Sequence, residues 1–198
     1  MGRLTAAVVD LDLHSALSIR LGGTNAGVDF GQVVALETFN LIDATASLDV
    51  QMQPGFVGAI GNSYLIVRLD GTNSVGMPLV PGNTNGFSGL GEGSLLSLPD
   101  GAAFRISYKG GDGNDIVLTQ VAVPPVLHPL LFQGDGSILI SGAGTPGEIY
   151  EVQSTTNLGN LGGWILIGTT QAQPDGSLFL VETNPPAASQ VYFRLHHP

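Results

Sequence analysis

The chain has 198 residues, of which 16 are acidic and 6 basic, so its formal net charge at pH 7 is −10. Hydrophobic residues make up 43% of the chain and charged residues 11%, a balance that excludes an intrinsically disordered protein. Six basic side chains cannot neutralise a phosphate backbone, which excludes nucleic acid as a partner. No stretch approaches the roughly 18 apolar residues of a membrane span, so we expect no transmembrane segment. The absence of cysteine excludes disulfides and thiolate chemistry.

Short β-branched runs with period-two alternation recur along the chain, and 29 glycines and 12 prolines separate them. Sustained helical periodicity is absent, so the sequence predicts an all-β protein. In its first part we predict strands at Leu4–Leu13, Ala16–Leu21, Gln32–Leu36, Ala46–Met52, Ser63–Leu69, Phe104–Tyr108 and Ile116–Val121. Glycine-rich loops are expected at 22–27, 70–76 and 81–94, and the last is long enough to face a ligand.

A domain boundary is predicted where three prolines, Pro124, Pro125 and Pro129, interrupt the strand pattern. We therefore expect a β-rich domain at 1–123, a Pro-rich linker at 124–131 and a small β-sandwich at 132–198. The third segment holds five or six predicted strands and two matching Asp-Gly-Ser turns, at 135–137 and 175–177. The predicted core anchors of this sandwich are Tyr150, Trp164, Phe179 and Phe193. The alternation around Tyr150 and Val152 predicts one buried and one solvated face.

The run SLPDGAAFRISYKGGDGNDIVLTQV (97–121) resembles the closing segment of autotransporter-like β-helix repeats of secreted or surface-anchored bacterial proteins. The upstream steps FGQVVAL and SYLIVRLDGTNSV fit the same order, so the resemblance covers residues 13–121. The run YEVQSTTNL, a tryptophan strand and a final YFRL resemble the small sandwich that follows such repeats. The resemblance implies a β-helix, β-roll-like or jelly-roll-like first unit, an Ig- or fibronectin-like second unit, and an extracellular location.

The motif GGDGNDIVL matches the calcium-binding nonapeptide of RTX-like β-roll proteins. A tight glycine-rich turn can present carboxylates and backbone carbonyls to a hard cation. Its candidate ligands are Gly110, Asp112, Gly113, Asn114 and Asp115. One copy supplies about half of a coordination shell, because each β-roll ion lies between successive repeats. A hairpin turn without an ion is therefore the competing interpretation, and Ca²⁺ is the single cofactor that the sequence proposes.

Two further patterns suggest binding sites. In DLDLH, Asp10, Asp12 and His14 follow at i, i+2 and i+4 and would project from one face of a strand, as metal ligands or as an ordinary solvated stripe. Trp164 is either a core residue of the sandwich or an exposed platform that stacks on a sugar.

The leading functional hypothesis is a non-catalytic, exported bacterial surface module for adhesion or assembly, with or without calcium. Its partners would be a glycan, another cell-surface component, or a second copy that pairs with an exposed strand edge. Asp10 and Asp12 interrupt the apolar core that a signal peptide needs, so an exported chain would be a mature or excised fragment. The alternative is a secreted, calcium-assisted hydrolase of a small ester, lactone or glycan. The sequence contains neither GxSxG nor HExxH, and its catalytic residues are unknown.

Overall fold

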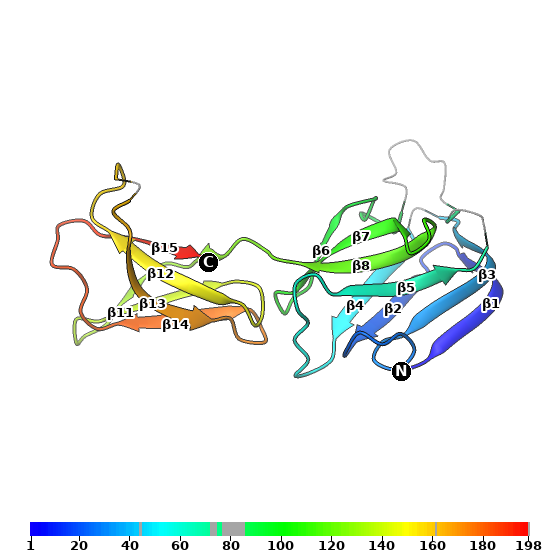
Figure 1. Ribbon diagram of the computed structural model, residues 1–198, viewed down its shortest axis with the longest axis horizontal. Coiled ribbons are helices and arrows are strands. Elements are labelled where there is room, and N and C mark those ends of the chain that lie inside the picture. Colours follow the sequence, from blue (N-terminus) through cyan, green and yellow to red (C-terminus); the bar gives the residue numbers. More distant parts are fainter. Residues whose placement is uncertain (44, 72–74, 77–85, 161, 198) are drawn as a thin grey trace. The chain divides into compact units, whose positions relative to one another are not determined.

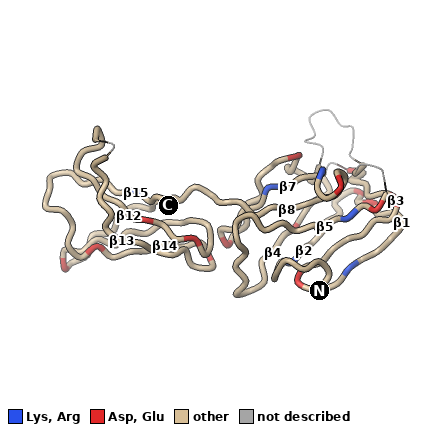
Figure 2. The backbone as a smooth tube through the Cα atoms, viewed as in Figure 1, with Lys and Arg blue, Asp and Glu red and all other residues tan. Residues whose placement is uncertain are grey.

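The computed structural model describes residues 1–43, 45–71, 75–76, 86–160 and 162–197. These residues form fifteen strands and no helix, which confirms the all-β prediction (Figure 1). The chain divides into two units: unit 1 comprises Met1–Leu98 and Ala103–Val121, and unit 2 comprises Pro99–Ala102 and Ala122–Pro198. Acidic residues occur along the backbone of both units (Figure 2). Parts of two predicted loops, 72–74 and 81–85, lie outside the described residues.

Unit 1 is built from two sheets. The larger sheet has the strand order β1-β3-β5-β8-β7-β6, in which β1, β3 and β5 run parallel and β8, β7 and β6 follow antiparallel. The smaller sheet is the parallel pair β2 and β4. The strands are β1 (Arg3–Leu11), β2 (Ala16–Leu21), β3 (Gln32–Leu41), β4 (Ser47–Met52), β5 (Ser63–Leu69), β6 (Leu95–Ser97), β7 (Ala103–Gly110) and β8 (Asp115–Val121).

The parallel strands of unit 1 pair at a nearly constant sequence separation. Arg3 lies opposite Gln32, a separation of 29 residues, and Ala16 lies opposite Ser47, a separation of 31 residues. The chain therefore alternates between the two sheets and returns to each of them one strand further along after about 30 residues. Apolar positions stack in the same way, because Leu11 pairs with the buried Leu41.

The core of unit 1 is aromatic as well as aliphatic. The ring of Tyr64 lies edge-on to Phe30 at a centroid distance of 5.6 Å and to Phe104 at 5.8 Å. All three rings are fully buried, and edge-to-face contacts add to the stabilisation from burial alone. Tyr108 is also buried, and its hydroxyl donates to Leu90 O and accepts from Phe87 N. The described part of the predicted 81–94 loop is thus fixed to β7.

Unit 2 places two small sheets around one core. The sheets are β10-β11-β14, with β9 also pairing with β11, and β13-β12-β15. Ile138, Ile140 and Val152 form the centre of the core, with Phe193 and Leu195 packed against it. The strands are β9 (Val126–Leu127), β10 (Leu131–Phe132), β11 (Ile138–Ala143), β12 (Ile149–Thr155), β13 (Ile165–Gln171), β14 (Ser177–Glu182) and β15 (Tyr192–His196).

The two Asp-Gly-Ser turns of unit 2 have the same hydrogen bonds. Asp135 Oδ1 accepts from Ser137 N at 3.0 Å and from its hydroxyl at 2.7 Å, and Asp175 Oδ1 accepts from Ser177 at the same two distances. These bonds lower the pKa of both carboxyls, with the serine hydroxyl as the largest cause. Each intervening glycine has a positive φ, which explains the residue type.

Several predicted boundaries differ from the structure. β3 runs on to Leu41 instead of ending at Leu36, and β1 ends at Leu11 instead of Leu13. Within the segment 124–131, predicted as a linker, β9 and the start of β10 pair with β11. Prolines are compatible with such pairing at a sheet edge, where one side of the strand needs no N–H donor.

The predicted core anchors of unit 2 divide into two groups. Tyr150 is fully buried and Phe193 packs against the core, as predicted. Phe179 is 58% exposed, because it alternates in β14 with the inward-facing Leu178 and Leu180. Trp164 is only half-buried and precedes β13 rather than lying in it. The prediction of Phe179 and Trp164 as core residues is therefore wrong.

Candidate functional site

The GGDGND motif forms the turn of the hairpin that joins β7 to β8. Gly110 pairs with Asp115 across the hairpin, and Gly113 N donates to Gly110 O at 2.8 Å. Gly111 and Gly113 have φ angles of +56° and +114°, which L side chains rarely adopt. The glycines are therefore required by the backbone of this turn, whether or not it binds an ion.

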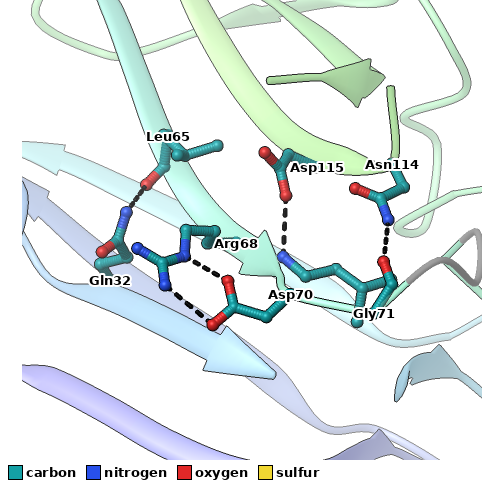
Figure 3. A network of polar contacts seen from close by, with 8 residues as sticks. Gln32, Leu65, Arg68, Asp70, Gly71, Asn114 and Asp115 are labelled. Carbon is teal, nitrogen blue, oxygen red and sulfur yellow. Dashed lines mark hydrogen bonds and ion pairs between the residues drawn. The ribbon is translucent and has the colours of Figure 1, made fainter. Parts of the chain in front are cut away.

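The carboxylate of Asp115 points into unit 1 rather than into solvent. Its Oδ1 accepts from Leu69 N at 2.8 Å, across 46 residues of sequence, and the residue is 3% exposed (Figure 3). A β-carbon on Gly111 would collide with Asp115 Oδ2, so the glycine also makes room for this carboxylate. Burial raises the pKa of Asp115 above its usual range, and the hydrogen bond from Leu69 opposes that rise.

Neighbouring polar groups attach the same turn to the end of β5. Asn114 Nδ2 donates to Gly71 O at 2.6 Å (Figure 3). Arg68 makes a bidentate contact with Asp70, in which Nη2 donates to Oδ2 at 2.8 Å, and the pKa of Asp70 is lowered mainly by these hydrogen bonds. Arg68 also lies close enough to Asp115 to favour its ionised form. The turn and β5 are thus connected by side-chain contacts in addition to the β5–β8 ladder.

These contacts bear on whether the predicted ligands fit calcium. Asp115, Asn114 and the Gly110 carbonyl already have hydrogen-bond partners inside unit 1, whereas Asp112 is exposed. A cation that took both Asp115 oxygens would displace Leu69 N and leave a buried donor unpaired. In the described part of the chain, no group of three or more His, Asp or Glu side chains could hold a metal ion. The residues fit a hydrogen-bonded turn better than a calcium shell.

The three residues of DLDLH do not share one strand face. Asp10 lies in β1 and accepts from Asn40 Nδ2 at 2.7 Å. Asp12 lies in the following turn, where its Oδ1 accepts from the Ser15 hydroxyl. His14 has a φ of +60°, and its backbone N donates to Thr45 Oγ1. Because β1 ends at Leu11, the strand geometry behind this metal prediction is not realised.

Trp164 lies at the outer face of the β13-β12-β15 sheet, where it contacts Arg194, the first residue of a row of polar side chains. The guanidinium carbon of Arg194 is 4.2 Å from the centroid of the indole ring. Arg194 Nε donates to Gln153 Oε1 at 2.8 Å, and Gln153 Nε2 donates to Glu151 Oε2 at 2.6 Å. The row ends at His196, whose Nδ1 is 3.4 Å from Glu151 Oε2. These residues form the second candidate site, which we call the Trp164 face.

Sequence reasoning identified Trp164 but missed its partners. The alternation in β12 correctly predicts that Glu151 and Gln153 face solvent, because Tyr150 and Val152 are fully buried. It does not reveal which strand lies beside β12. Arg194 reaches Gln153 only because β15 pairs with β12 across 41 residues of sequence.

The other histidines are placed separately. The backbone N of His128 donates to Ser141 O. His197 Nε2 lies 3.2 Å from Glu148 Oε2, and the His197 ring lies against Tyr150.

Comparisons of the chain with protein-family models, curated proteins and solved structures found no match. Among the described residues there is no helix of the length and hydropathy needed to span a bilayer.

Proposed function

We propose that the protein is a non-catalytic module of an exported bacterial surface protein, in which unit 1 closes a parallel β-helix and unit 2 is an appended Ig-like sandwich that contacts partners. The return of the chain to each sheet after about 30 residues supports the β-helix part of this proposal. The resemblance of residues 97–121 to the end of autotransporter-like repeats supports the same assignment.

One observation carries the proposal, namely the difference between the two edges of the parallel stack. Beyond β5, the sheet continues through β8, β7 and β6, which run antiparallel. The parallel stacking of coils therefore ends at β5. At the other edge, β1 pairs with β3 alone and β2 with β4 alone within the described chain. Leu4 and Val8 of β1 are 59% and 46% exposed. This edge has the geometry to accept a further parallel coil, and the antiparallel edge does not.

A duplicated coil tests this assignment. A second copy of residues 3–31 is inserted before Arg3, so that the copy can pair with β1 and β2 as these pair with β3 and β4. We expect the melting temperature to rise, because the added coil covers Leu4 and supplies hydrogen bonds to two open strand edges. The control copy carries Leu11→Asp and Leu17→Asp, which place charges at inward positions. If both insertions change the melting temperature equally, unit 1 is not a stack that can be extended.

Location and catalysis are tested separately. An antibody against unit 2 should label intact source cells, and external protease should abolish the signal. The chain should not hydrolyse 4-nitrophenyl acetate or a simple lactone above the buffer rate, with calcium or with chelator. Calcium-dependent turnover that is lost in Asp112→Ala would replace this proposal with a secreted hydrolase.

A further inference from the structure

We infer that the Trp164 face of unit 2 is a binding site for a neutral glycan chain. This inference rests on the proposed function in one respect, because it names the partner class of the surface module. The site itself is defined by the outward side chains of β12, β13 and β15, together with Trp164.

The outward residues form cross-strand rows. Gln153 lies opposite Leu166 on one side and Arg194 on the other, and Glu151 lies opposite Thr169 and His196 in the same way. Directly opposite residues on neighbouring strands point to the same face of a sheet. The inward residues of these strands, Val152, Ile167, Phe193 and Leu195, belong to the core of unit 2. The polar row and the core therefore occupy opposite faces of one sheet.

Two aromatic side chains lie at one end of this face. Thr155 lies opposite Tyr192, and Trp164 immediately precedes β13 at the same end of the sheet. Both aromatic residues are half-buried, so each retains accessible surface. Aromatic rings present apolar area with little conformational entropy to lose, which suits them to stack on the C–H face of a sugar ring.

The polar row supplies groups that match sugar hydroxyls. Arg194, Gln153 and Glu151 are planar groups with several donors or acceptors, and the hydrogen bonds between them hold their orientation before any ligand binds. Among the described residues, Nε is the one atom of Arg194 with a hydrogen-bond partner, which leaves its Nη donors for a ligand. A preorganised polar row reduces the entropy lost on binding.

Charge selects a neutral ligand. On the face itself the positive charge of Arg194 is balanced by Glu151, to which Arg194 is linked through Gln153. The chain as a whole carries a net charge of −10, which repels an anionic polymer.

The experiment uses the single tryptophan of the full chain as reporter, since Trp164 lies in the site. Its emission is titrated with hydroxyethylcellulose, galactomannan and soluble starch as neutral probes, and with alginate as an anionic probe. The same polymers are cast in native gels for variants that lack the indole. We expect at least one neutral polymer to change the emission and to retard the chain, and alginate to do neither.

The variants are Gln153→Ala and Tyr192→Ala, which keep the reporter, and Trp164→Ala, which is read in gels. Each should weaken binding at least about tenfold, as expected when a central contact of a binding site is removed. Phe179→Ala is the matched control, because it removes an exposed aromatic side chain from the other sheet. Circular dichroism confirms that each variant is folded.

Three results would overturn the inference: binding of no neutral polymer, binding of alginate alone, or equal loss of binding in Phe179→Ala. None of them changes the outcome of the coil duplication or of the cell labelling. Failure of this site and failure of the proposed function are therefore distinguishable.

Discussion

The GGDGND turn of unit 1 and the two Asp-Gly-Ser turns of unit 2 use the same residue types for different purposes. Asp135 and Asp175 bond to serines two residues away and stay exposed, so their pKa values are lowered. Asp115 bonds to Leu69, 46 residues away, and burial raises its pKa. An aspartate beside glycine can thus either shape its own turn or hold two distant segments together. Because Trp164 is the single tryptophan of the chain, its emission reports on the unfolding of unit 2, whereas circular dichroism reports on the whole chain.

The largest effect is expected for Gly111→Ala. Alanine at a φ of +56° costs about 1–2 kcal/mol, and its β-carbon collides with the Asp115 carboxylate, which adds about 1–3 kcal/mol if the bond to Leu69 breaks. Urea unfolding followed by circular dichroism should shift to lower urea, while Trp164 emission should not. The control is Gly136→Ala, at a φ of +87° with no atom within 4 Å of the new carbon. Equal destabilisation by both variants would show that Asp115 contributes little.

Asp115→Ala comes next. It leaves the Leu69 N–H buried without its acceptor, which costs about 1–3 kcal/mol. Asp175→Ala removes bonds that solvent can replace, so we expect a smaller loss, seen in Trp164 emission. Urea midpoints of the two variants check this order. A larger loss for Asp175→Ala would reverse the assignment of local and long-range roles.

The pH dependence should have opposite signs in the two kinds of turn. Because the pKa of folded Asp115 lies above its ordinary value of 3.8, the folded state binds more protons between these two values, and its contribution to stability falls as pH rises through them. Asp135 and Asp175 contribute stability that is lost as pH falls below 3.8. Relative to Asp115→Asn, which keeps the acceptor, the parent should lose melting temperature as the pH rises above 3.8. A difference independent of pH would contradict the raised pKa.

Calcium should have the smallest effect. Since Asp115 accepts from Leu69 N, we expect the melting temperature to be the same with millimolar calcium and with chelator. A bound ion at ten times its dissociation constant would instead stabilise the fold by about 1.4 kcal/mol. A calcium shift in the parent that disappears in both Asp112→Ala and Asp115→Ala would support the nonapeptide site.

Features that depend on residues close together in the chain are predictable from the amino-acid sequence. Period-two alternation gave the all-β class, the strand at 63–69 and the buried and solvated faces of β12. The Asp-Gly-Ser turns were also readable, because their hydrogen bonds close within five residues. Local patterns overestimated the length of β1 and underestimated β3, since neighbouring strands decide where pairing ends.

The contacts of the candidate residues depend on pairing between strands that are distant in sequence. Asp115 is a long-range acceptor because β5 and β8 are paired. Arg194 lies against the Trp164 ring and reaches Gln153 because β15 pairs with β12. Likewise, the three prolines of 124–131 predict a linker, but Val126, Leu127 and Leu131 of this segment pair with β11. Such contacts join residues about 40 positions apart or bring strands together in an order that no local pattern records. Pairing between strands distant in sequence is set by how the whole chain buries its apolar faces, and that is a property of the fold.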